Sequence, residues 1–481
     1  MAGEIFARPD AFLEILAMPT RRAFIGQTAA VMGLAVSGRQ VSAASHAPAT
    51  LTARDATAQL APDGYAPTSI WGYEGRAPGP AIRVHQGERV RRRLVNGLLE
   101  PTSVHWHGIR IDNAMDGVSG LTQEAVAPGQ AFVYDFVAPD AGTYWYHAHN
   151  RSWVQVARGL HGPLIVEEAE PPEVDREETL VLDDWLLDPE TAMIEDSFDQ
   201  PMRMSHGGRI GNLITTNGRF DLSIPVARHM RLRLRLINAS NARIFPLQLT
   251  GMRGWTVALD GMPLAAPEPL EDVLVLAPAQ RADLIVDVTT EAGEIAHLVR
   301  IGNNDQPASQ VAFPVSGSTA QTPRTIPAAL PPNPGDDLGA LADAQPLRLV
   351  MSGGAMGRMD SAFLGGERLG FRELAARGRF WAFNEMAEMT QAPLADLSLG
   401  EPVRLEIVNE TAFPHAMHLH GMHFREIRDG EPVGPMRDTL MVAVQETREI
   451  GFIADNAGDW LFHCHMLSHA ESGMMTWVRV T

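Results

Sequence analysis

The chain has 481 residues, a length that corresponds to roughly three domains of about 150 residues each. Its 58 acidic and 39 basic residues give a net charge of -19, and a surface of this charge repels phosphate backbones, which argues against nucleic-acid binding. A single cysteine, Cys464, excludes an intrachain disulfide framework and any thiolate-rich zinc or iron–sulfur site.

Residues 1–47 carry features of an export signal rather than of a folded domain. A pair of arginines, Arg21 and Arg22, precedes an apolar stretch, 23–37, that is too short to span a bilayer. Small residues at 41–43 then offer a cleavage site for a signal peptidase. The pattern resembles a twin-arginine signal, so we expect the folded protein to be exported to the periplasm or secreted. A basic N-terminal tail without this function is the alternative, and Met18 is a second candidate for the start of the chain.

Short β-rich runs separated by Gly, Pro, Asn and Asp turns fill the chain from residue 50 onward. None approaches the roughly 18 apolar residues of a membrane span, and we expect no such span. The segment 231–237 alternates strictly, which is typical of a strand with one buried face. Many short strands at regular spacing predict an all-β fold of β-sandwiches. Further strands are predicted at 81–85, 88–94, 131–137, 162–166, 347–351, 403–408 and 476–480, and a loop with a short helix at 371–377 is predicted within 354–380.

Two linkers divide the chain into three segments. Residues 167–178 are acidic and contain two adjacent prolines, and residues 322–337 are richer still in proline. The segments predict domains at 48–168, 178–320 and 340–481. Each contains one charged, alternating strand that ends in Val-Asn or Ile-Asn, so the sequence indicates one type of domain used three times. These three strands are predicted at 87–96, 231–238 and 400–409.

Ten of the 17 histidines lie in four short windows. Because alternate side chains of a strand point to the same face, each His-X-His pair presents two imidazoles to one side. Four such pairs supply eight neutral nitrogen ligands, which are too many for one metal ion and suit a cluster of two or three. Imidazole ligation without carboxylates favours copper or zinc over magnesium or calcium. The eight histidines are His105, His107, His147, His149, His418, His420, His463 and His465.

A second ligand set surrounds Cys464. The histidines on either side of it point to one face of their strand, so the sulfur points to the opposite face. Cys464, His469 and Met474 supply thiolate, imidazole and thioether, and His415 can complete the set. Two histidines, a cysteine and a weak axial methionine are the ligands of a blue electron-transfer copper. Adjacent residues therefore join the two metal sites by a short covalent route for electrons.

The four windows resemble the ligand motifs of multicopper oxidases, the laccase-like and copper-efflux oxidase group, over nearly all of the chain. The resemblance implies three consecutive cupredoxin-like Greek-key β-sandwich domains and four copper ions per chain. It also implies one-electron oxidation of a reductant at the type 1 copper and four-electron reduction of O2 to water at the other three. By motif position, the type 1 copper corresponds to His415, Cys464, His469 and Met474, the type 2 copper to His105 and His418, and the type 3 pair to His107, His147, His149, His420, His463 and His465.

Two acidic residues bear on the supply of protons. Asp116 aligns with an acidic residue that the family places beside the cluster as a proton donor, and an ordinary aspartate in an Asp-Gly turn is the alternative. Many relatives carry a glutamate directly after the second type 1 histidine, but this chain has Ala470 there, followed by Glu471. We expect the Glu471 side chain to face away from the cluster.

The reducing substrate is the open question of the sequence. We expect a monomeric, laccase-like oxidase that takes phenols, amines or other small donors. The alternative is a periplasmic oxidase of cuprous ion, since Met351, Met356 and Met359, with Asp360 nearby, offer soft ligands for this ion. The segment lacks the dense methionine run of the efflux oxidases, and flexible apolar packing is the other role open to these side chains.

Three other classes share parts of this pattern. A copper nitrite reductase has no counterpart of His465, the second histidine of the doublet around the cysteine. A structural relative without copper has lost its ligands, whereas this chain keeps all of them. A copper-storage protein has no use for Cys464 between two histidines. The sequence therefore favours an oxidase.

Overall fold

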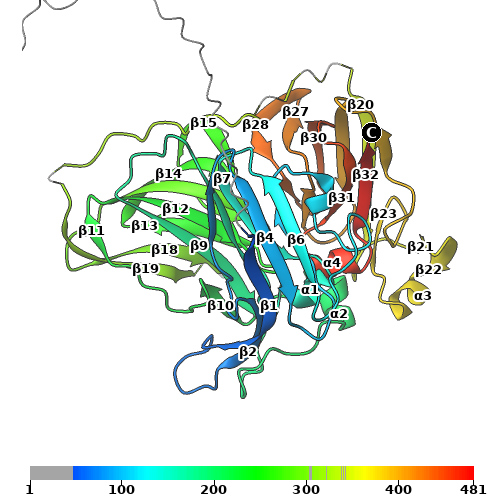
Figure 1. Ribbon diagram of the computed structural model, residues 1–481, viewed down its shortest axis with the longest axis horizontal. Coiled ribbons are helices and arrows are strands. Elements are labelled where there is room, and N and C mark those ends of the chain that lie inside the picture. The colour runs from blue at the N-terminus through cyan, green and yellow to red at the C-terminus, as the bar shows by residue number, and fades with distance from the viewer. Residues whose placement is uncertain (1–46, 303–305, 321, 337, 340, 342) are drawn as a thin grey trace, which may run out of the picture. The chain divides into compact units, whose positions relative to one another are not determined.

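A computed structural model describes residues 47–481 apart from 303–305, 321, 337, 340 and 342. The predicted export signal lies outside the described residues. Strands dominate, and the few helices are short (Figure 1). None of the helices in the described part of the chain has the length and apolar character to cross a membrane. The helices are α1 (Ser152–Gln155), α2 (Pro201–Ser205), α3 (Phe371–Ala376) and α4 (Leu467–Glu471), with a 3-10 turn at Asn113–Met115.

The first eight strands form two four-stranded sheets, in the orders β2-β1-β4-β6 and β3-β8-β7-β5. Their inward-facing apolar side chains pack in one buried cluster, which explains the alternating burial of β3 and β4. The bounds are β1 Ala49–Ala58, β2 Thr68–Tyr73, β3 Ile82–His85, β4 Arg89–Asn96, β5 Val104–His107, β6 Ala131–Val137, β7 Gly142–Ala148 and β8 His161–Glu167.

The next eleven strands form a six-stranded sheet, β10-β9-β12-β17-β14-β15, and a five-stranded sheet, β11-β19-β18-β13-β16. They enclose a second apolar cluster. The bounds are β9 Arg176–Trp185, β10 Leu213–Thr216, β11 Val226–Arg228, β12 Arg231–Asn238, β13 Phe245–Thr250, β14 Met252–Leu259, β15 Met262–Pro269, β16 Leu274–Leu276, β17 Arg281–Val288, β18 Ile295–Ile301 and β19 Pro307–Ser318.

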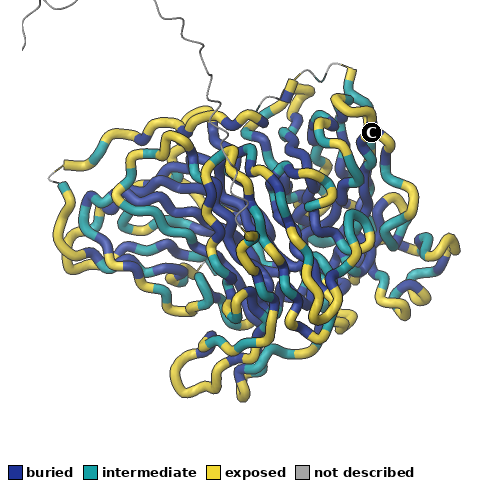
Figure 2. The backbone as a smooth tube through the Cα atoms, viewed as in Figure 1, coloured by how far each residue is buried: buried dark blue, intermediate teal, exposed yellow. Residues whose placement is uncertain are grey.

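The last strands form sheets β23-β20-β25-β30-β27-β28 and β24-β32-β31-β26-β29 around a third cluster, plus the hairpin β21-β22. Figure 2 shows that burial follows the strands and that exposure concentrates in the connections. The bounds are β20 Gln345–Gly353, β21 Ser361–Leu364, β22 Glu367–Gly370, β23 Trp381–Phe383, β24 Ala395–Leu397, β25 Pro402–Asn409, β26 His415–Leu419, β27 Phe424–Arg428, β28 Glu431–Arg437, β29 Thr439–Val442, β30 Thr447–Ile453, β31 Gly458–Cys464 and β32 Met475–Val480.

The strands predicted as an internal repeat, β4, β12 and β25, have the same partners in the three groups of sheets. Each pairs in parallel with the first strand of its group, β1, β9 or β20. On its other side each pairs antiparallel with β6, β17 or β30. The exact division into three domains stays a prediction, because the contacts join Pro48–Thr481 in a single unit.

The asparagine that ends each repeated strand has the same structural role three times. Asn96, Asn238 and Asn409 are buried. Each side-chain amide donates to one main-chain carbonyl of the following loop and to one of a segment further along the chain, and each side-chain oxygen accepts the N–H of the residue two positions later. A buried loop must satisfy its polar groups, so the recurring Val-Asn or Ile-Asn holds the loop after the strand.

The prediction of one exposed face for β12 is wrong. All eight residues of β12 are buried. The guanidinium of Arg231 makes two bonds to Asp287, and that of Arg233 lies between Asp283 and Glu168. Alternation in sequence therefore reports two chemically different buried faces here, since paired charges can be buried where unpaired ones cannot. The predicted helix near 371–377 is present as α3, but the adjoining hairpin β21-β22 is absent from the prediction.

Candidate metal centre

Two predicted ligands, His415 and Cys464, lie at the ends of β26 and β31, which pair antiparallel with Met417 opposite Cys464, and the other two, His469 and Met474, lie in α4 and directly before β32. The sulfur of Cys464 lies 3.5 Å from Nδ1 of His415 and 3.9 Å from Nδ1 of His469, and these two nitrogens are 3.2 Å apart. The N–H of Cys464 donates to the carbonyl of Met474 at 3.1 Å, so the buried methionine sits beside the cysteine. Sequence positions 415, 464, 469 and 474 therefore meet in one buried place.

Hydrogen bonds turn Nδ1 of both histidines toward the sulfur. Nε2 of His415 donates to the hydroxyl of Thr411 at 2.8 Å, and Nε2 of His469 donates to the carbonyl of His206 at 2.6 Å. Burial lowers the pKa of His415 well below its ordinary value and that of His469 to about 4, so both rings are neutral near pH 7. Burial raises the pKa of the Cys464 thiol to about 12, so a bound metal ion has to displace that proton. Two inward lone pairs and a thiol fit a blue copper.

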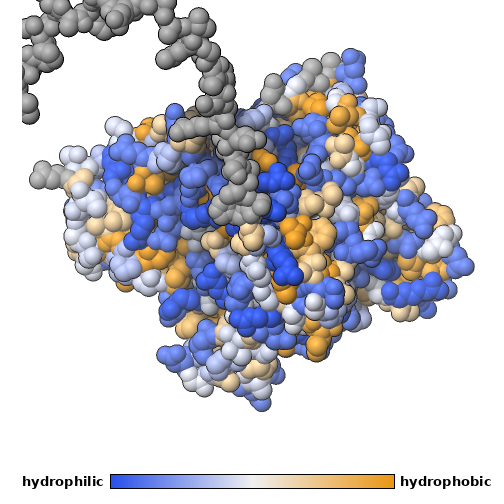
Figure 3. Space-filling view, in the orientation of Figure 1, coloured by the Kyte–Doolittle hydropathy of each residue, from blue (hydrophilic) through white to orange (hydrophobic). Residues whose placement is uncertain are grey.

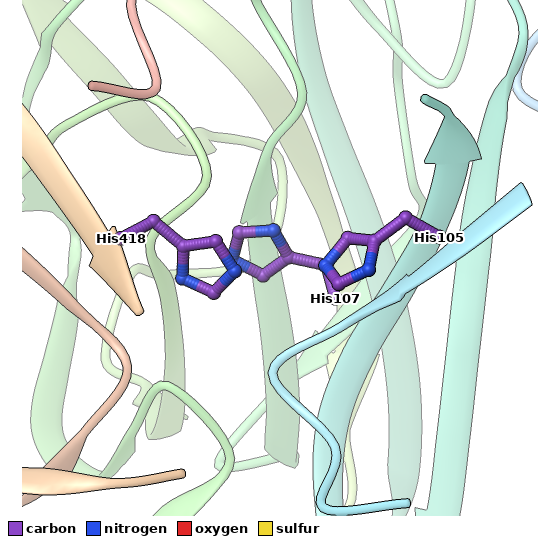
Figure 4. Close-up of side chains that lie close together, drawn as sticks. All are labelled: His105, His107 and His418. Atoms are coloured by element: carbon purple, nitrogen blue, oxygen red, sulfur yellow. The ribbon is translucent and has the colours of Figure 1, made fainter. Parts of the chain in front are cut away.

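The eight histidines of the His-X-His windows come together in a second buried cluster. β5 pairs with β7 so that His105 lies opposite His147, and β26 pairs with β31 so that His418 lies opposite His463. The first and last groups of sheets thus supply all eight rings, and Figure 4 shows three of them facing one another. Within each set, the ligand atoms lie within 4.8 Å of one another, and the sets are His105, His107 and His418; His107, His147 and His465; and His149, His420 and His463.

Two imidazole nitrogens in this cluster face each other without a proton between them. Nδ1 of His463 donates to the carbonyl of Cys464 at 3.0 Å, and Nδ1 of His420 donates to Asp116, so neither Nε2 carries a proton. These two Nε2 atoms are 3.1 Å apart. Two lone pairs at this distance repel, and a metal ion bound by both, at about 2.0 Å from each, removes the repulsion.

Other nitrogens of the cluster are buried with no hydrogen-bond partner among the described residues. They are Nε2 of His105, His149 and His418 and Nδ1 of His107 and His465. Desolvation by burial lowers the pKa of His107 well below its ordinary value and that of His149 to about 3, so these rings are neutral. Unpartnered neutral nitrogens are costly in an apolar interior unless a ligand satisfies them. The donor set therefore fits a cluster of metal ions bound by imidazole.

Comparison with known proteins identifies this arrangement. Two family profiles, both described as multicopper oxidase, match residues 56–171 and 368–481. The multicopper oxidase MmcO of Mycobacterium tuberculosis is 30% identical, over 95% of this chain and 91% of that protein. The chain belongs to the multicopper oxidase family. It is a copper-dependent oxidoreductase with an all-β, cupredoxin-like fold.

Two further similarities add detail to this multicopper oxidase. The crystal structure of Lac15 from a marine microbial metagenome matches with a TM-score of 0.73 and 40% identity, covering 90% of this chain and 100% of that chain. A copper resistance protein A homolog of Pseudomonas syringae is 26% identical, over 84% of this chain and 88% of that protein. Both similarities extend over most of this chain.

Asp116 contacts the histidine cluster of the oxidase, as the sequence predicts. Its carboxylate lies 3.1 Å from Nδ1 of His420 and 3.1 Å from Nδ1 of His105. Its main-chain carbonyl also accepts from Nδ1 of His105 at 2.9 Å. The side chain is buried, so the carboxylate stands between two rings of the cluster and away from bulk water. Its role as a proton donor stays a prediction.

A second carboxylate, Asp438, is absent from the sequence prediction. Its Oδ1 lies 3.2 Å from Nε2 of His107, and its main-chain carbonyl accepts from Nδ1 of His418 at 2.9 Å. Burial alone raises the pKa of this carboxyl, but the charge of Arg281 outweighs burial and holds it well below its usual range. Asp438 lies 18 positions after His420 in an ordinary-looking segment, so only the pairing of β29 with β26 reveals its contact.

The expectation that the Glu471 side chain faces away from the cluster stays a prediction, although the residue shares a cavity with two histidines. Glu471 lines a cavity of about 140 Å³ together with His149 and His463. Burial raises the pKa of its carboxyl to about 7. Glu471 is the last residue of the short helix α4, which begins two residues after His465.

The three methionines of the predicted cuprous site do not share one surface. Met351 and Met359 are buried in two different apolar clusters, whereas Met356 is exposed. Apolar packing therefore explains two of the three, and Met356 alone is presented to solvent.

Proposed function

We propose that this oxidase binds four copper ions per chain. The observation that carries the proposal is the pair of unprotonated Nε2 atoms of His420 and His463, which face each other at 3.1 Å. When bound, the copper ions supply one-electron oxidation of a donor and four-electron reduction of O2 to water. The type 1 ion binds to His415, Cys464, His469 and Met474, the type 2 ion to His105 and His418, one type 3 ion to His107, His147 and His465, and the other to His149, His420 and His463.

Cys464 serves as the link between the two kinds of site. Its sulfur belongs to the type 1 set, while its neighbours His463 and His465 belong to the two type 3 sets. One stretch of strand β31 therefore joins a donor-side ligand to both ligand sets on the O2 side through a few covalent bonds. Asp116 acts as the proton donor of the cluster, because its buried carboxylate contacts two of the rings.

The donor belongs to the class of phenols, aromatic amines and similar small molecules. His415 and His469 are both 0% exposed, so a donor meets the residues that cover them rather than the rings themselves. The covering rings of His206 and Phe413 are half-buried and lie 5.8 Å apart. Half-buried rings of this kind favour a donor that packs an aromatic face against them.

Cuprous ion is the second candidate donor, and two exposed methionines favour it. Met202 on α2 and Met356 are each 69% exposed. The N–H of Ala355 donates to the carbonyl of Ser205 at 2.8 Å, which places the two methionine-bearing segments side by side, next to His206. Thioethers are soft ligands that suit cuprous ion.

Oxygen uptake by the copper-loaded protein distinguishes the two donors. A dimethoxyphenol and a cuprous chelate are compared, each with and without added cupric ion. Phenol turnover without added copper supports the laccase-like proposal. Fast uptake on cuprous ion, with phenol turnover only in added cupric ion, supports the alternative. Met202→Leu with Met356→Leu then lowers uptake on cuprous ion alone, whereas Met230→Leu, in the middle group of sheets, changes neither donor.

We also propose that the chain is exported folded, through Arg21 and Arg22, to the periplasm or the medium, and acts as a monomer. The face in Figure 3 is mainly hydrophilic with small, scattered apolar patches, which supports the monomer. Replacing both arginines by lysine retains the protein in the cytoplasm in a fractionation assay, and size-exclusion chromatography measures the oligomeric state.

A further inference from the structure

One buried contact joins all three groups of sheets next to the histidine cluster. Arg281, the first residue of β17, is 0% exposed and belongs to the middle group, which supplies no predicted copper ligand. Its two terminal nitrogens donate to the two carboxylate oxygens of Asp438 at 2.9 and 2.5 Å. The remaining donors reach the main-chain carbonyls of Thr143, Ala279 and Asp260 at 3.0–3.1 Å. All N–H groups of this buried guanidinium are thus used, and its position is fixed.

The side of Asp438 away from Arg281 faces the histidine cluster. Its Oδ1 accepts from Nε2 of His107 at 3.2 Å and from the hydroxyl of Thr439 at 2.7 Å. Its main-chain carbonyl accepts from Nδ1 of His418. The rings of His107 and His418 stack with centroids 3.7 Å apart, and Figure 4 shows the two rings next to each other. One residue therefore contacts both rings, at a different nitrogen in each.

These contacts decide which nitrogen each ring keeps free. A proton on Nε2 of His107 leaves a lone pair on Nδ1, and Nδ1 is the buried atom without a partner. In His418 the proton lies on Nδ1, and Nε2 is the atom without a partner. The two stacked rings therefore leave different nitrogens unprotonated, Nδ1 in His107 and Nε2 in His418.

We propose that Arg281 and Asp438 form a positioning pair through which the middle group of sheets sets the tautomer and orientation of His107 for metal binding, while the main-chain carbonyl of Asp438 does the same for His418. The proposal rests on the proposed function for the identity of the metal, but not for the tautomers. Neither residue touches the ions in this account. They act through the two rings, in the way that carboxylates outside a metal site commonly orient ligating histidines.

The backbone of the first histidine window supports this pair. Gly108 has φ +84°, and a Cβ atom there would lie 2.2 Å from a terminal nitrogen of Arg281 and 2.5 Å from Oδ2 of Asp438. Only glycine leaves room for the pair directly after His107. The carbonyl of Gly108 also accepts from Nε2 of His423 at 2.8 Å, so that histidine has a structural partner.

The first test uses copper-free protein and nitrogen-15 NMR of its histidine rings. We expect the proton of His107 on Nε2 and that of His418 on Nδ1. A proton on Nδ1 of His107 would overturn the proposal. This measurement needs no copper, so a failure of the copper assignment leaves its outcome readable.

The second test removes the pair without leaving a buried charge, in the double variant Arg281→Met with Asp438→Leu. We expect the Nε2 proton of His107 to exchange faster, His418 to stay unchanged, and copper affinity of the cluster to fall about 10–100-fold while the blue absorption of the type 1 site remains. Asp438→Asn keeps an oxygen acceptor and restores most of the affinity. Unchanged copper affinity in the double variant contradicts the proposal.

A matched control separates positioning from plain stability. Arg231 and Asp287 also form a buried, two-bond ion pair, between β12 and β17, and neither bonds to a histidine of the cluster among the described residues. Arg231→Met with Asp287→Leu should leave copper affinity and the ring NMR signals unchanged. If this control loses copper to the same extent, the role of Arg281 and Asp438 is merely structural and the proposal fails.

Discussion

At both metal sites, hydrogen bonds to the surrounding groups determine which nitrogen of a histidine ring carries the proton. A nitrogen that donates to a carbonyl, hydroxyl or carboxylate leaves the other nitrogen of the same ring unprotonated and turned inward, as in His415 and His463. Ordinary hydrogen bonds thus orient the ligand rings before any metal is bound. Copper ions then bind without a rearrangement of the rings.

Cys464→Ser tests the link between the sites. A hydroxyl is a poor ligand for a blue copper, so we expect loss of the blue absorption and of donor oxidation. The histidine cluster keeps its ligands, so copper per chain should fall from about four ions to about three. Metal analysis and visible absorption of the purified variant measure both. Retained turnover would show that electrons take a route that avoids this residue.

Acid should destabilise the copper-free protein through its neutral, buried histidines. Burial lowers the folded-state pKa of His469 to about 4 and of His149 to about 3, whereas unfolded histidine titrates near 6.5. Below about pH 6.5 the unfolded chain binds more protons, so stability is lost as the pH falls toward these values, by up to about 3–5 kcal/mol for each ring. Urea unfolding between pH 7.5 and 4.5 measures this loss. An unfolding free energy that is flat over that range would contradict it.

At the residue scale, the sequence predicts the ligands well because His-X-His on a strand has one geometric meaning. Asp438 and Arg281 could not be predicted, since their contacts with His107 and with each other span sequence distances of 331 and 157 residues. The place of Glu471 beside the same cavity as His149 and His463 also depends on helix α4, which follows the cysteine strand.

At the scale of elements, one strand with a terminal asparagine recurs in each group of sheets. In the last group this asparagine also reaches a metal site, because Thr411 donates to the side-chain oxygen of Asn409 and accepts from Nε2 of His415. In the middle group, the equivalent hydroxyl is that of Ser240, which donates to Asn238 and bonds to no predicted ligand within the described residues. The same element therefore carries a purely structural role in one group and a metal-orienting role in another.

Asn409→Ala and Asn238→Ala exploit this difference. Each variant leaves buried main-chain groups without hydrogen-bond partners and should lower the free energy of unfolding by about 2–4 kcal/mol. Only Asn409→Ala should also shift the blue absorption, since it loosens Thr411 behind His415. Urea unfolding and visible spectra of both variants make the comparison. A spectral shift in Asn238→Ala as large as that in Asn409→Ala would contradict the local explanation.

Strand β12 shows where sequence patterns fail at this scale. Period-two alternation is read as one wet and one dry face, but the arginines of β12 are buried in ion pairs with residues 168, 283 and 287. The pattern shows which side chains share a face of the strand, but not which residues surround each face. The all-β class and most strands could be predicted from local alternation, whereas burial of this polar face required knowledge of the neighbouring strands.

At the scale of the whole molecule, the first and last groups of sheets supply the ligands, and the middle group holds parts of both sites in place. Its segment after α2 caps His469 through the carbonyl of His206, and its strand β17 contacts Asp438 through Arg281. The proline-rich connections predict separate segments but give no sign of these contacts. These contacts of the middle group form only when the three groups of sheets pack together, so the separate segments of the sequence do not reveal them.

The stoichiometry of donor to O2 is the most direct test of a type 1 site that is linked to a trinuclear cluster. Copper-loaded protein is supplied with a one-electron donor in a closed cell, and donor consumed, O2 consumed and peroxide formed are measured together. A type 1 site linked to a three-ion cluster predicts about four donor molecules per O2, with water as the product and no peroxide. A ratio of about two, with peroxide accumulating, would contradict the assignment of the eight histidines to one trinuclear cluster.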